Sequence, residues 1–409
     1  MKKEPIKSRG WILMVFCWAT MFIAYIGVLG IGMVLPDIRA DFGMTLEQGG
    51  YLSTIAFGTQ VILAIPVALF ATRINPKYVL GAVFVCTGSG FLLHGVANTP
   101  VVLYIGRGLV SIGYGLVAAP MALLKTSWVP NSRIATINGY DQFAGQLGQI
   151  VGTMAVTGIV AILGSYRVFM NILGVAGMVI AVLWFVFYRE NEENPIQLAT
   201  GVGFIEPLKE ALREKSVWLL ALGWPGTTLV WIAFTTFWPT YASETLGLSM
   251  AEAGIAIGMI PIFSAIACVT SPQLANLIGR DKLMIWPWGI ILCAAYYGGV
   301  VFNNFYLLCV CFAIAGYGAF AFVPIAMSII FKLGTLSPSG ITLGMAVIMM
   351  LVNVGGALAG VVVGKLSSFM ELREALSWCC LTPLLWFAMT IFLPELGRKR
   401  QEELAAGNK

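Results

Sequence analysis

The chain has 409 residues, of which 59% are hydrophobic and only 11% are charged, whereas soluble domains average about 25% charged residues. This composition excludes an ordinary water-soluble core. Apolar runs of about 20 residues are long enough to cross the hydrocarbon layer as helices, and such runs leave no soluble domain over. The formal net charge of +5 is therefore interpreted as a marker of membrane topology, and nucleic acid is not expected as a partner.

Twelve apolar runs predict twelve transmembrane helices joined by short loops, except at residues 189–215. That charged loop predicts a cytoplasmic linker between a six-helix bundle in residues 1–188 and another in residues 216–409. The first run is too long for a signal-peptide core and is expected to remain as the first span. The predicted spans are residues 11–35, 48–70, 78–97, 101–124, 136–162, 168–188, 216–238, 250–270, 283–302, 305–331, 341–364 and 375–393.

Basic residues indicate how the spans are oriented in the membrane. With the N-terminus in the cytoplasm, 19 of the 24 lysines and arginines fall on the inner side. The outer side then holds only Arg39, Arg167, Lys365 and Arg373, while Arg107 lies within a span. Because inner loops carry an excess of lysine and arginine, we expect a multi-pass protein of the inner (plasma) membrane with both termini in the cytoplasm.

The two predicted bundles repeat one another. The matching features are Pro36 with Pro239, Glu47 with Glu252, Gly113-Tyr114-Gly115 with Gly316-Tyr317-Gly318, Pro120 with Pro324, and Arg167 with Arg373. They follow in the same order at separations of 203 to 206 positions, which indicates a duplicated six-span unit. Two parallel repeats that enclose a site near the bilayer midplane are the architecture of one large class of transporters.

Several local patterns resemble the major facilitator superfamily over essentially the whole chain. Residues 35–43, Leu-Pro-Asp-Ile-Arg-Ala-Asp-Phe-Gly, are similar to the end of the family's first span, and Arg107 with Gly113 and Gly115 resembles its span-4 motif. The resemblance implies an all-α membrane protein of twelve helices in two pseudo-symmetric bundles, which takes up, exports or exchanges a small molecule. The glycine-rich span 5 of the family is matched by Gly145, Gly148 and Gly152.

The family's signature loop between spans 2 and 3, G-x-x-x-D-R-x-G-R-R, is only partly present. Residues 68–77 keep Arg73 and the last basic residue, Lys77, but lack the acid, and residues 276–282 in the second half are similarly partial. Arg73 is predicted to act in gating, and the acid of the family's acid-to-arginine latch is absent from this stretch.

Span 4 carries a predicted polar stripe. At 100 degrees per residue, Arg107, Ser111 and Tyr114 lie close to one face, and Lys125 returns to that angle 18 residues after Arg107. An arginine within a span is costly and indicates a functional site. Arg107 and Tyr114 are therefore predicted to bind substrate and Lys125 to act in gating or coupling. The alternative is that Arg107 binds backbone carbonyls and holds the first bundle together.

Span 5 has an amide face and a glycine face. Gln142, Gln146 and Gln149 are spaced i, i+4, i+7 and are predicted to line a cavity, with Gln142 and Gln146 as substrate ligands. Ordinary hydrogen bonding between helices is the alternative. Small residues permit close helix contact in lipid, so the glycine face is expected to pack against a neighbouring helix.

Asp141 is the one acid expected within a span. An acid there is a candidate proton carrier, but Lys125 and Arg133 lie close in sequence and favour a salt bridge, so Asp141 is assigned to gating or coupling. His94, the single histidine, lies near the outer end of span 3. It is expected to be an interfacial polar residue rather than a proton switch.

The second half offers polar aromatics rather than charge. Trp231, Tyr317 and Asn353 are expected near mid-depth, as Tyr25 is in the first half. Rings with a polar tip make good cavity walls, so these four residues complete the predicted substrate-binding set. Apolar packing or lipid contact is the alternative role for each of them.

The cationic groups of span 4 favour a small organic anion, such as a monocarboxylate, as the solute of a secondary transporter that works by alternating access. A coupling proton or an exchanged anion is the expected second ligand, and the protein is expected to act as a monomer in the lipid bilayer. The alternatives are a proton-driven exporter of neutral or lipophilic compounds, which the shortage of buried acids disfavours, and a membrane channel.

Enzyme chemistry is not expected. One histidine cannot form a multi-histidine metal site, and the eight cysteines lie within apolar runs without metal or disulfide spacing. No acids are paired at matching depth, and no G-x-x-x-x-G-K loop is present to bind ATP. No catalytic residue, metal or cofactor is therefore predicted.

Overall fold

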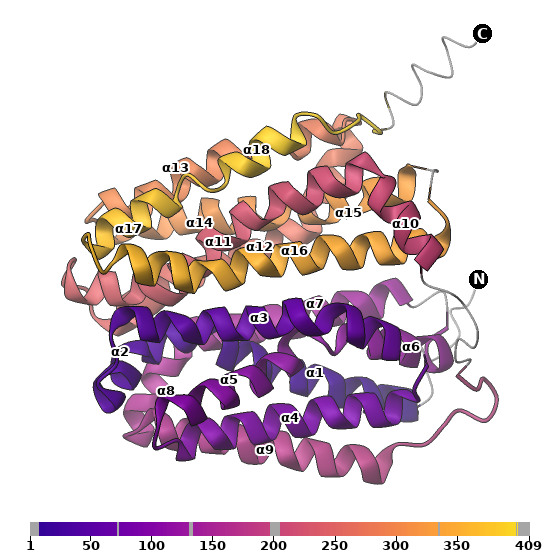
Figure 1. Cartoon of the computed structure of the whole chain (residues 1–409), viewed down its shortest axis with the longest axis horizontal. Helices are drawn as coiled ribbons and strands as arrows, with labels where there is room; N and C mark the ends of the chain where they lie inside the picture. Colours follow the sequence, from indigo (N-terminus) through magenta and orange to yellow (C-terminus); the bar gives the residue numbers. More distant parts are fainter. Residues whose placement is uncertain are drawn as a thin grey trace. The chain divides into compact units, whose positions relative to one another are not determined.

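The computed structural model describes residues 8–71, 73–130, 134–196, 205–333, 336–397 and 399. The chain forms two compact units, Met1–Val202 and Gly203–Lys409, called unit 1 and unit 2 below (Figure 1). The boundary between them falls within the linker predicted at residues 189–215. The described part of the chain is almost entirely helical and contains no strand, so the predicted all-α class is confirmed.

Unit 1 begins with two helices that form span 1 and its extension, and a π-helical turn interrupts span 5. Its elements are α1 (Ser8–Leu29), α2 (Ile31–Phe42), α3 (Leu46–Ala71), α4 (Pro76–Val96), α5 (Pro100–Gly115), α6 (Ala118–Trp128), α7 (Ile134–Ile150), the π-turn η2 (Val151–Ala155), α8 (Val156–Leu163) and α9 (Tyr166–Phe187). Asn75 caps α4 by accepting a hydrogen bond from the backbone N–H of Lys77, with Pro76 as the first helical residue.

Unit 2 starts with a short amphipathic helix before its first span. Its elements are α10 (Ile205–Arg213), α11 (Lys215–Glu244), α12 (Met250–Ile278), the 3-10 turn η3 (Lys282–Met284), α13 (Trp288–Val301), α14 (Phe305–Ala321), α15 (Val323–Lys332), α16 (Pro338–Leu366), α17 (Leu372–Cys379) and α18 (Leu384–Thr390). A capping box between Ser249 and Glu252 begins α12, and Gly279 ends it in the left-handed conformation that glycine adopts most easily.

Eleven helical stretches in the described residues are long and apolar enough to cross a membrane. The twelfth predicted span, residues 375–393, is instead divided between α17 and α18 by a turn that contains Pro383. Proline lacks an N–H and its ring clashes with the preceding turn, which favours a break at Pro383, although α11 continues through Pro225 and α12 through Pro261. Trp386 of α18 is nevertheless fully buried in unit 2.

Span 4 was expected as one helix but is two. α5 ends at Gly115 and α6 begins at Ala118, two residues before Pro120. The angular argument that returned Lys125 to the face of Arg107 requires an unbroken helix, so it does not hold. In unit 2 the corresponding span is divided in the same way, between α14 and α15, just before Pro324.

The glycine face of span 5 packs against α1, as the sequence predicted. A methyl group placed on Gly148 would lie 2.5 Å from the carbonyl oxygen of Phe22, and one on Gly145 would lie 3.0 Å from the ring of Tyr25. In unit 2, a methyl group on Gly355 of α16 would lie 2.2 Å from the carbonyl oxygen of Pro225 in α11. Both units therefore bring their first and fifth spans together through a glycine.

The internal repeat also appears in hydrogen bonds within each unit. Trp184 of α9 donates its indole N–H to the carbonyl of Lys77 at 2.9 Å, and Trp386 of α18 donates to Ile285 at 3.0 Å. The Gln60 amide donates to the carbonyl of Ser111, and 204 positions later the Ser264 hydroxyl donates to the carbonyl of Gly316. The two units thus share internal contacts as well as spacing.

Candidate functional site

Among the described residues of unit 1, Arg107 of α5 is the most buried charged group, with no exposed surface. Its Nε donates to the carbonyl of Leu52 at 3.0 Å, Nη1 to Gly27 at 2.6 Å and Nη2 to Val28 at 2.7 Å. These bonds join α1 and α3 to α5, which is the structural role that the sequence left open. They give each guanidinium nitrogen one acceptor but leave the charge in place, since Arg107 forms no ion pair with any residue in the described ranges.

Two phenol rings lie on the same helices as these contacts. Tyr25 of α1 and Tyr114 of α5 have ring centroids 4.5 Å apart, and Phe57 of α3 meets Tyr114 edge to face at 5.7 Å. Tyr114 follows Arg107 by two helical turns on α5. The structure therefore brings two predicted substrate ligands, Tyr25 and Tyr114, into direct contact within the bundle that contains the Arg107 charge.

The three glutamines of α7 differ in their surroundings. Gln142 is exposed, whereas Gln146 and Gln149 are only 6% and 1% exposed. Among the described groups, Oε1 of Gln146 and Nε2 of Gln149 have no hydrogen-bond partner. Buried polar atoms are normally paired, so these two amides retain capacity to bind a polar ligand or water. A π-turn follows them at η2, and such turns often occur at functional sites.

Lys125 and Asp141 form a nearly dry ion pair, as the sequence favoured. The Lys125 ammonium contacts Asp141 Oδ2 and donates to the amide oxygen of Asn138 at 2.8 Å. Trp18 of α1 donates its indole N–H to Asp141 Oδ1 at 2.7 Å. The lysine and aspartate side chains are 9% and 14% exposed. Arg133, the other candidate partner, lies outside the described residues.

Arg73 and His94 are the two remaining candidate residues of the first half. Arg73 lies exposed in the turn between α3 and α4. His94 was expected at the interface, but it is 1% exposed and is packed between helices, with its Cδ2 2.8 Å from where a methyl on Gly106 would lie. The glycine leaves room on α5 for the imidazole, and the sequence alone gave no sign of that pairing.

The candidate residues of unit 2 have different neighbours. Trp231 packs edge to face on Phe320, with ring centroids 5.7 Å apart, and its Nε1 has no partner among the described groups. Tyr317 is 5.6 Å from Trp288 between ring centroids, and its hydroxyl is 3.0 Å from the Thr270 hydroxyl. Asn353 on α16 is half-buried.

The sequence missed the polar clusters at the ends of the bundles. In unit 2, Lys332 contacts Asp281 at 2.6 Å, and Glu395 accepts the backbone N–H groups of Asp281 at 2.8 Å and Lys282 at 3.2 Å. In unit 1, Glu190 accepts from the side chain of Asn75. Glu190 precedes Glu395 by 205 positions, so the repeat spacing was the signal that could have found the pair.

A further ion pair joins α2 to α9. Asp41 accepts hydrogen bonds from the Tyr166 hydroxyl at 2.5 Å and from Arg167 Nε at 2.7 Å. The bond from Tyr166 is the larger cause and the bond from Arg167 the next, and together they hold the pKa of the Asp41 carboxyl below its usual range. A lowered pKa means that the contact stabilises the fold at neutral pH and is lost as the pH falls through that pKa.

A family model described as Major Facilitator Superfamily matches residues 17–332. The chain is 24% identical to the probable sulfoacetate transporter SauU of Cupriavidus necator, over 68% of this chain and 64% of that protein. It is also 24% identical to the hexuronate transporter of Bacillus subtilis, over 61% and 60% of the two chains. The chain therefore spans less than two thirds of the length of these two relatives.

Two further likenesses extend the comparison. A probable nitrate/nitrite antiporter of Thermus thermophilus is 22% identical over 72% of this chain and 67% of that protein. Among solved structures, a bacterial homolog of the human lysosomal transporter Spinster, inward-facing and unoccupied, matches with a TM-score of 0.73 at 17% identity over 95% of both chains. This likeness concerns the fold, and the predicted twelve-helix layout in two bundles agrees with it.

Proposed function

This chain belongs to the major facilitator superfamily, and we propose that it carries a small organic anion, such as a monocarboxylate, across the inner membrane by alternating access. Members of this family are membrane transporters and not enzymes, so the open questions are the solute and the mechanism. The proposal places both termini in the cytoplasm. In support, Arg9 at the start of α1 and Arg189 just after α9 line one pocket, as expected for an even number of crossings in unit 1.

One observation carries the anion proposal: the buried charge of Arg107 has no counter-ion within the described part of the chain. Carbonyl oxygens accept one hydrogen bond from each of its three nitrogens, but they do not cancel a full positive charge. In a medium of low dielectric constant this charge attracts an anion over several ångströms. Lys125 differs, because Asp141 neutralises it. The relatives named for sulfoacetate, hexuronate and nitrate are consistent with an anionic solute.

The donors proposed to hold the anion are the phenol hydroxyls of Tyr25 and Tyr114 and the amide N–H groups of Gln142 and Gln146. Arg107 supplies the attraction through space, while its own N–H groups remain on the backbone carbonyls. In unit 2 we assign substrate contact to the unpaired indole N–H of Trp231 and to the polar groups that follow: Tyr317 and Asn353.

The experiment that tests this function is a thermal-stability screen of the purified protein against small carboxylates, inorganic anions, sugars and lipophilic cations. A ligand that binds only the folded state raises stability by about 2.7 kcal/mol at 100 times its dissociation constant. We expect stabilisation by carboxylates alone, followed by saturable uptake of the hit into proteoliposomes. Stabilisation by lipophilic cations alone would instead support an exporter, and unsaturable flux would support a channel.

The Lys125–Asp141 pair is the proposed coupling group, with Arg73 as a gating residue. Protonating Asp141 would neutralise the carboxylate that the Lys125 ammonium contacts. The contact that joins α6 to α7 would then be released. Asp141→Asn should therefore abolish accumulation driven by a proton gradient while exchange of labelled substrate across the membrane continues. Both are measured in proteoliposomes, with and without an imposed pH gradient.

The control for this prediction is Asp37→Asn, which changes an exposed acid on α2 and should leave both activities intact. Gradient-driven accumulation by the Asp141→Asn protein at the wild-type level would rule out this carboxylate as the coupling group.

A further inference from the structure

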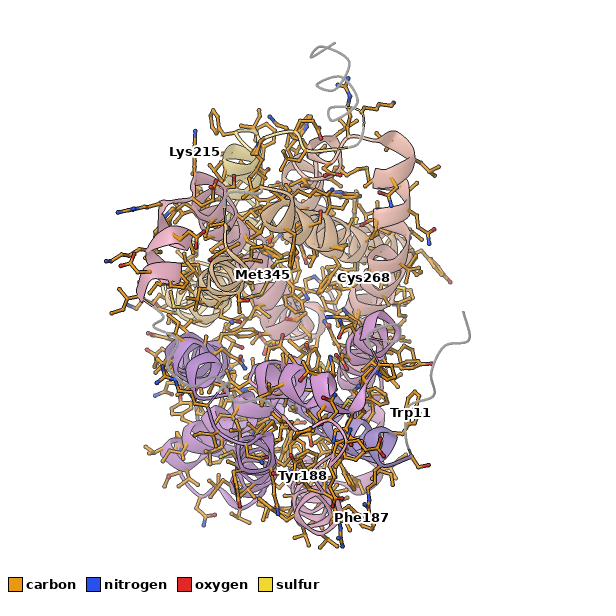
Figure 2. The ribbon with its side chains drawn as sticks, turned by 90° about the vertical axis from the view of Figure 1, so that its right-hand side faces the viewer. Trp11, Phe187, Tyr188, Lys215, Cys268 and Met345 are labelled. Atoms are coloured by element: carbon orange, nitrogen blue, oxygen red, sulfur yellow. The ribbon has the colours of Figure 1, made fainter. Side chains whose placement is uncertain are left out.

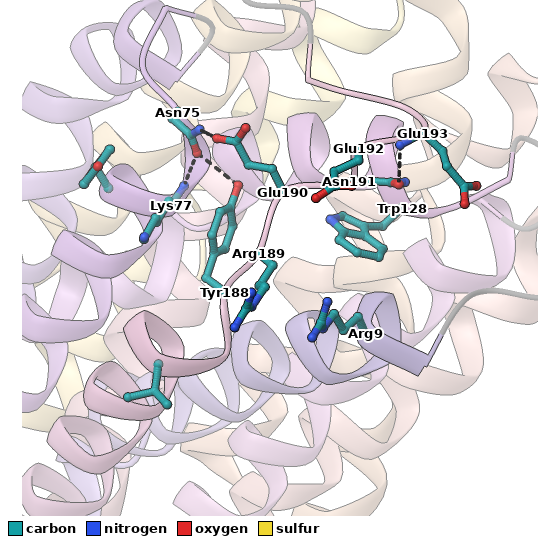
Figure 3. A pocket seen from close by; sticks show the side chains of 12 residues that line it. Arg9, Asn75, Lys77, Trp128, Tyr188, Arg189, Glu190, Asn191, Glu192 and Glu193 are labelled. Carbon is teal, nitrogen blue, oxygen red and sulfur yellow. Dashed lines mark hydrogen bonds between the residues drawn. The ribbon is translucent and has the colours of Figure 1, made fainter.

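A pocket of about 930 Å³ lies in unit 1 at the end of the bundle where α1 begins and α9 ends (Figure 3). Its walls come from the start of α1, the start of α4, the end of α6 and the segment that follows α9. Arg107, Lys125 and the residues proposed to bind the transported anion do not line it. The pocket is therefore independent of the proposed transport site.

Three cations from three different elements line the pocket: Arg9, Lys77 and Arg189. None of them forms an ion pair with another residue that the structure describes. The Lys77 ammonium lies 5.8 Å from the ring centroid of Tyr188, within cation–π distance. Tyr188 is 5% exposed, although the adjacent Phe187, also labelled in Figure 2, is 48% exposed, so the end of α9 turns a phenol inward toward these cations.

The opposite wall is acidic. In Figure 3, the side chains of Arg9 and Arg189 lie on one side, and Glu190, Glu192 and Glu193 lie on the other. Glu190 is already bound to Asn75. The carboxylates would repel a ligand that carries two negative charges more strongly than a ligand that carries one. The cationic wall therefore suits an anion, and the acidic wall restricts its charge.

Trp128 provides an independent sign of a binding site. It lines the pocket and is 7% exposed, yet its indole N–H has no partner among the described groups. A buried N–H without a partner is unusual in native proteins, and an indole can only donate. An oxygen acceptor that enters the pocket would supply a partner for this N–H.

We propose that this pocket binds a phosphodiester monoanion, held by Arg9, Lys77 and Arg189 and by the indole N–H of Trp128. Arginine and lysine are the usual ligands of phosphate oxygens. A diester carries a single charge at neutral pH, as the acidic wall requires, whereas a free phosphate carries between one and two. Val186 at the rim is 67% exposed, which gives the substituents of a diester an apolar contact. Phospholipid headgroups and soluble diesters share this chemistry.

The test is native mass spectrometry of the purified full chain in detergent, titrated with dihexanoyl phosphatidylglycerol, glycerophosphoglycerol or inorganic phosphate. We expect Lys77→Gln and Arg189→Gln each to weaken binding of the short-chain lipid by about fivefold, the effect of one cation near a charged lipid surface. Trp128→Phe, which keeps an aromatic ring and removes the N–H donor, should weaken lipid binding by about threefold or more. Lys365→Gln, an exposed cation in unit 2, is the matched control and should change nothing.

The source of the ligand follows from the two diester probes. Equal binding of glycerophosphoglycerol and the lipid assigns the pocket to soluble diesters, and preference for the lipid assigns it to a headgroup. Inorganic phosphate that binds as tightly as either diester would overturn the proposal. Unchanged lipid binding in Lys77→Gln and Arg189→Gln proteins that melt like wild type would also overturn it.

Discussion

Arg107→Gln is expected to weaken binding of the transported anion by about thirtyfold. A unit charge about 8 Å away contributes about 2 kcal/mol at an effective dielectric constant of 20, and glutamine removes that charge. The measurement is the concentration of the carboxylate identified by the stability screen that half-saturates uptake into proteoliposomes. Because the change also removes the hydrogen bonds from Arg107 to carbonyls of α1 and α3, the free energy of unfolding should fall by about 1 to 3 kcal/mol or more.

Arg107→Lys separates the two effects. Lysine keeps the charge but cannot form the three bonds of the guanidinium fork, so stability should fall as in the glutamine protein while anion affinity stays close to wild type. If folded Arg107→Gln protein binds the anion as tightly as wild type, the anion proposal loses the observation on which it rests. The protein's place among membrane transporters would be unaffected.

Gly148→Ala should produce a large loss of stability for a single added methyl group. The new carbon would lie 2.5 Å from the carbonyl oxygen of Phe22 and 2.9 Å from Cβ of Tyr25, so α1 and α7 must separate. Overpacking of this kind costs about 1 to 3 kcal/mol and occasionally more. The expected result is a drop of several degrees in the melting temperature of the detergent-purified protein.

The same helix supplies the control. Gly139 also lies in α7, but a methyl group placed there meets no atom within 4 Å. Gly139→Ala should therefore be neutral or slightly stabilising, since alanine is favoured over glycine in a helix by about 1 kcal/mol. Equal melting temperatures for the two alanine proteins would show that α1 and α7 do not approach through Gly148.

The sequence by itself determined the class of fold, because long apolar runs in lipid can satisfy their backbone groups only as helices. The spacing of the repeats predicted the duplicated unit. Glycines at i, i+3 and i+7 predicted which face of span 5 packs against a neighbouring helix, which is α1 in the structure. Breaks within spans were harder to predict. Pro120 and Pro383 are visible in the sequence, but a proline in a membrane helix can either kink or end it, and the choice depends on neighbouring helices.

Only part of the candidate site could be predicted from the sequence. The sequence identified Arg107, Tyr114 and the Lys125–Asp141 pair as unusual, since charged and polar residues are rare within spans. Only the tertiary structure decided that Arg107 is bound to carbonyls of α1 and α3, that Trp18 completes the Asp141 contacts, and that Gln142 is exposed while Gln146 is buried. Periodicity along one helix gives the direction of a side chain, but its partners belong to other helices, and their depth and rotation are set by packing.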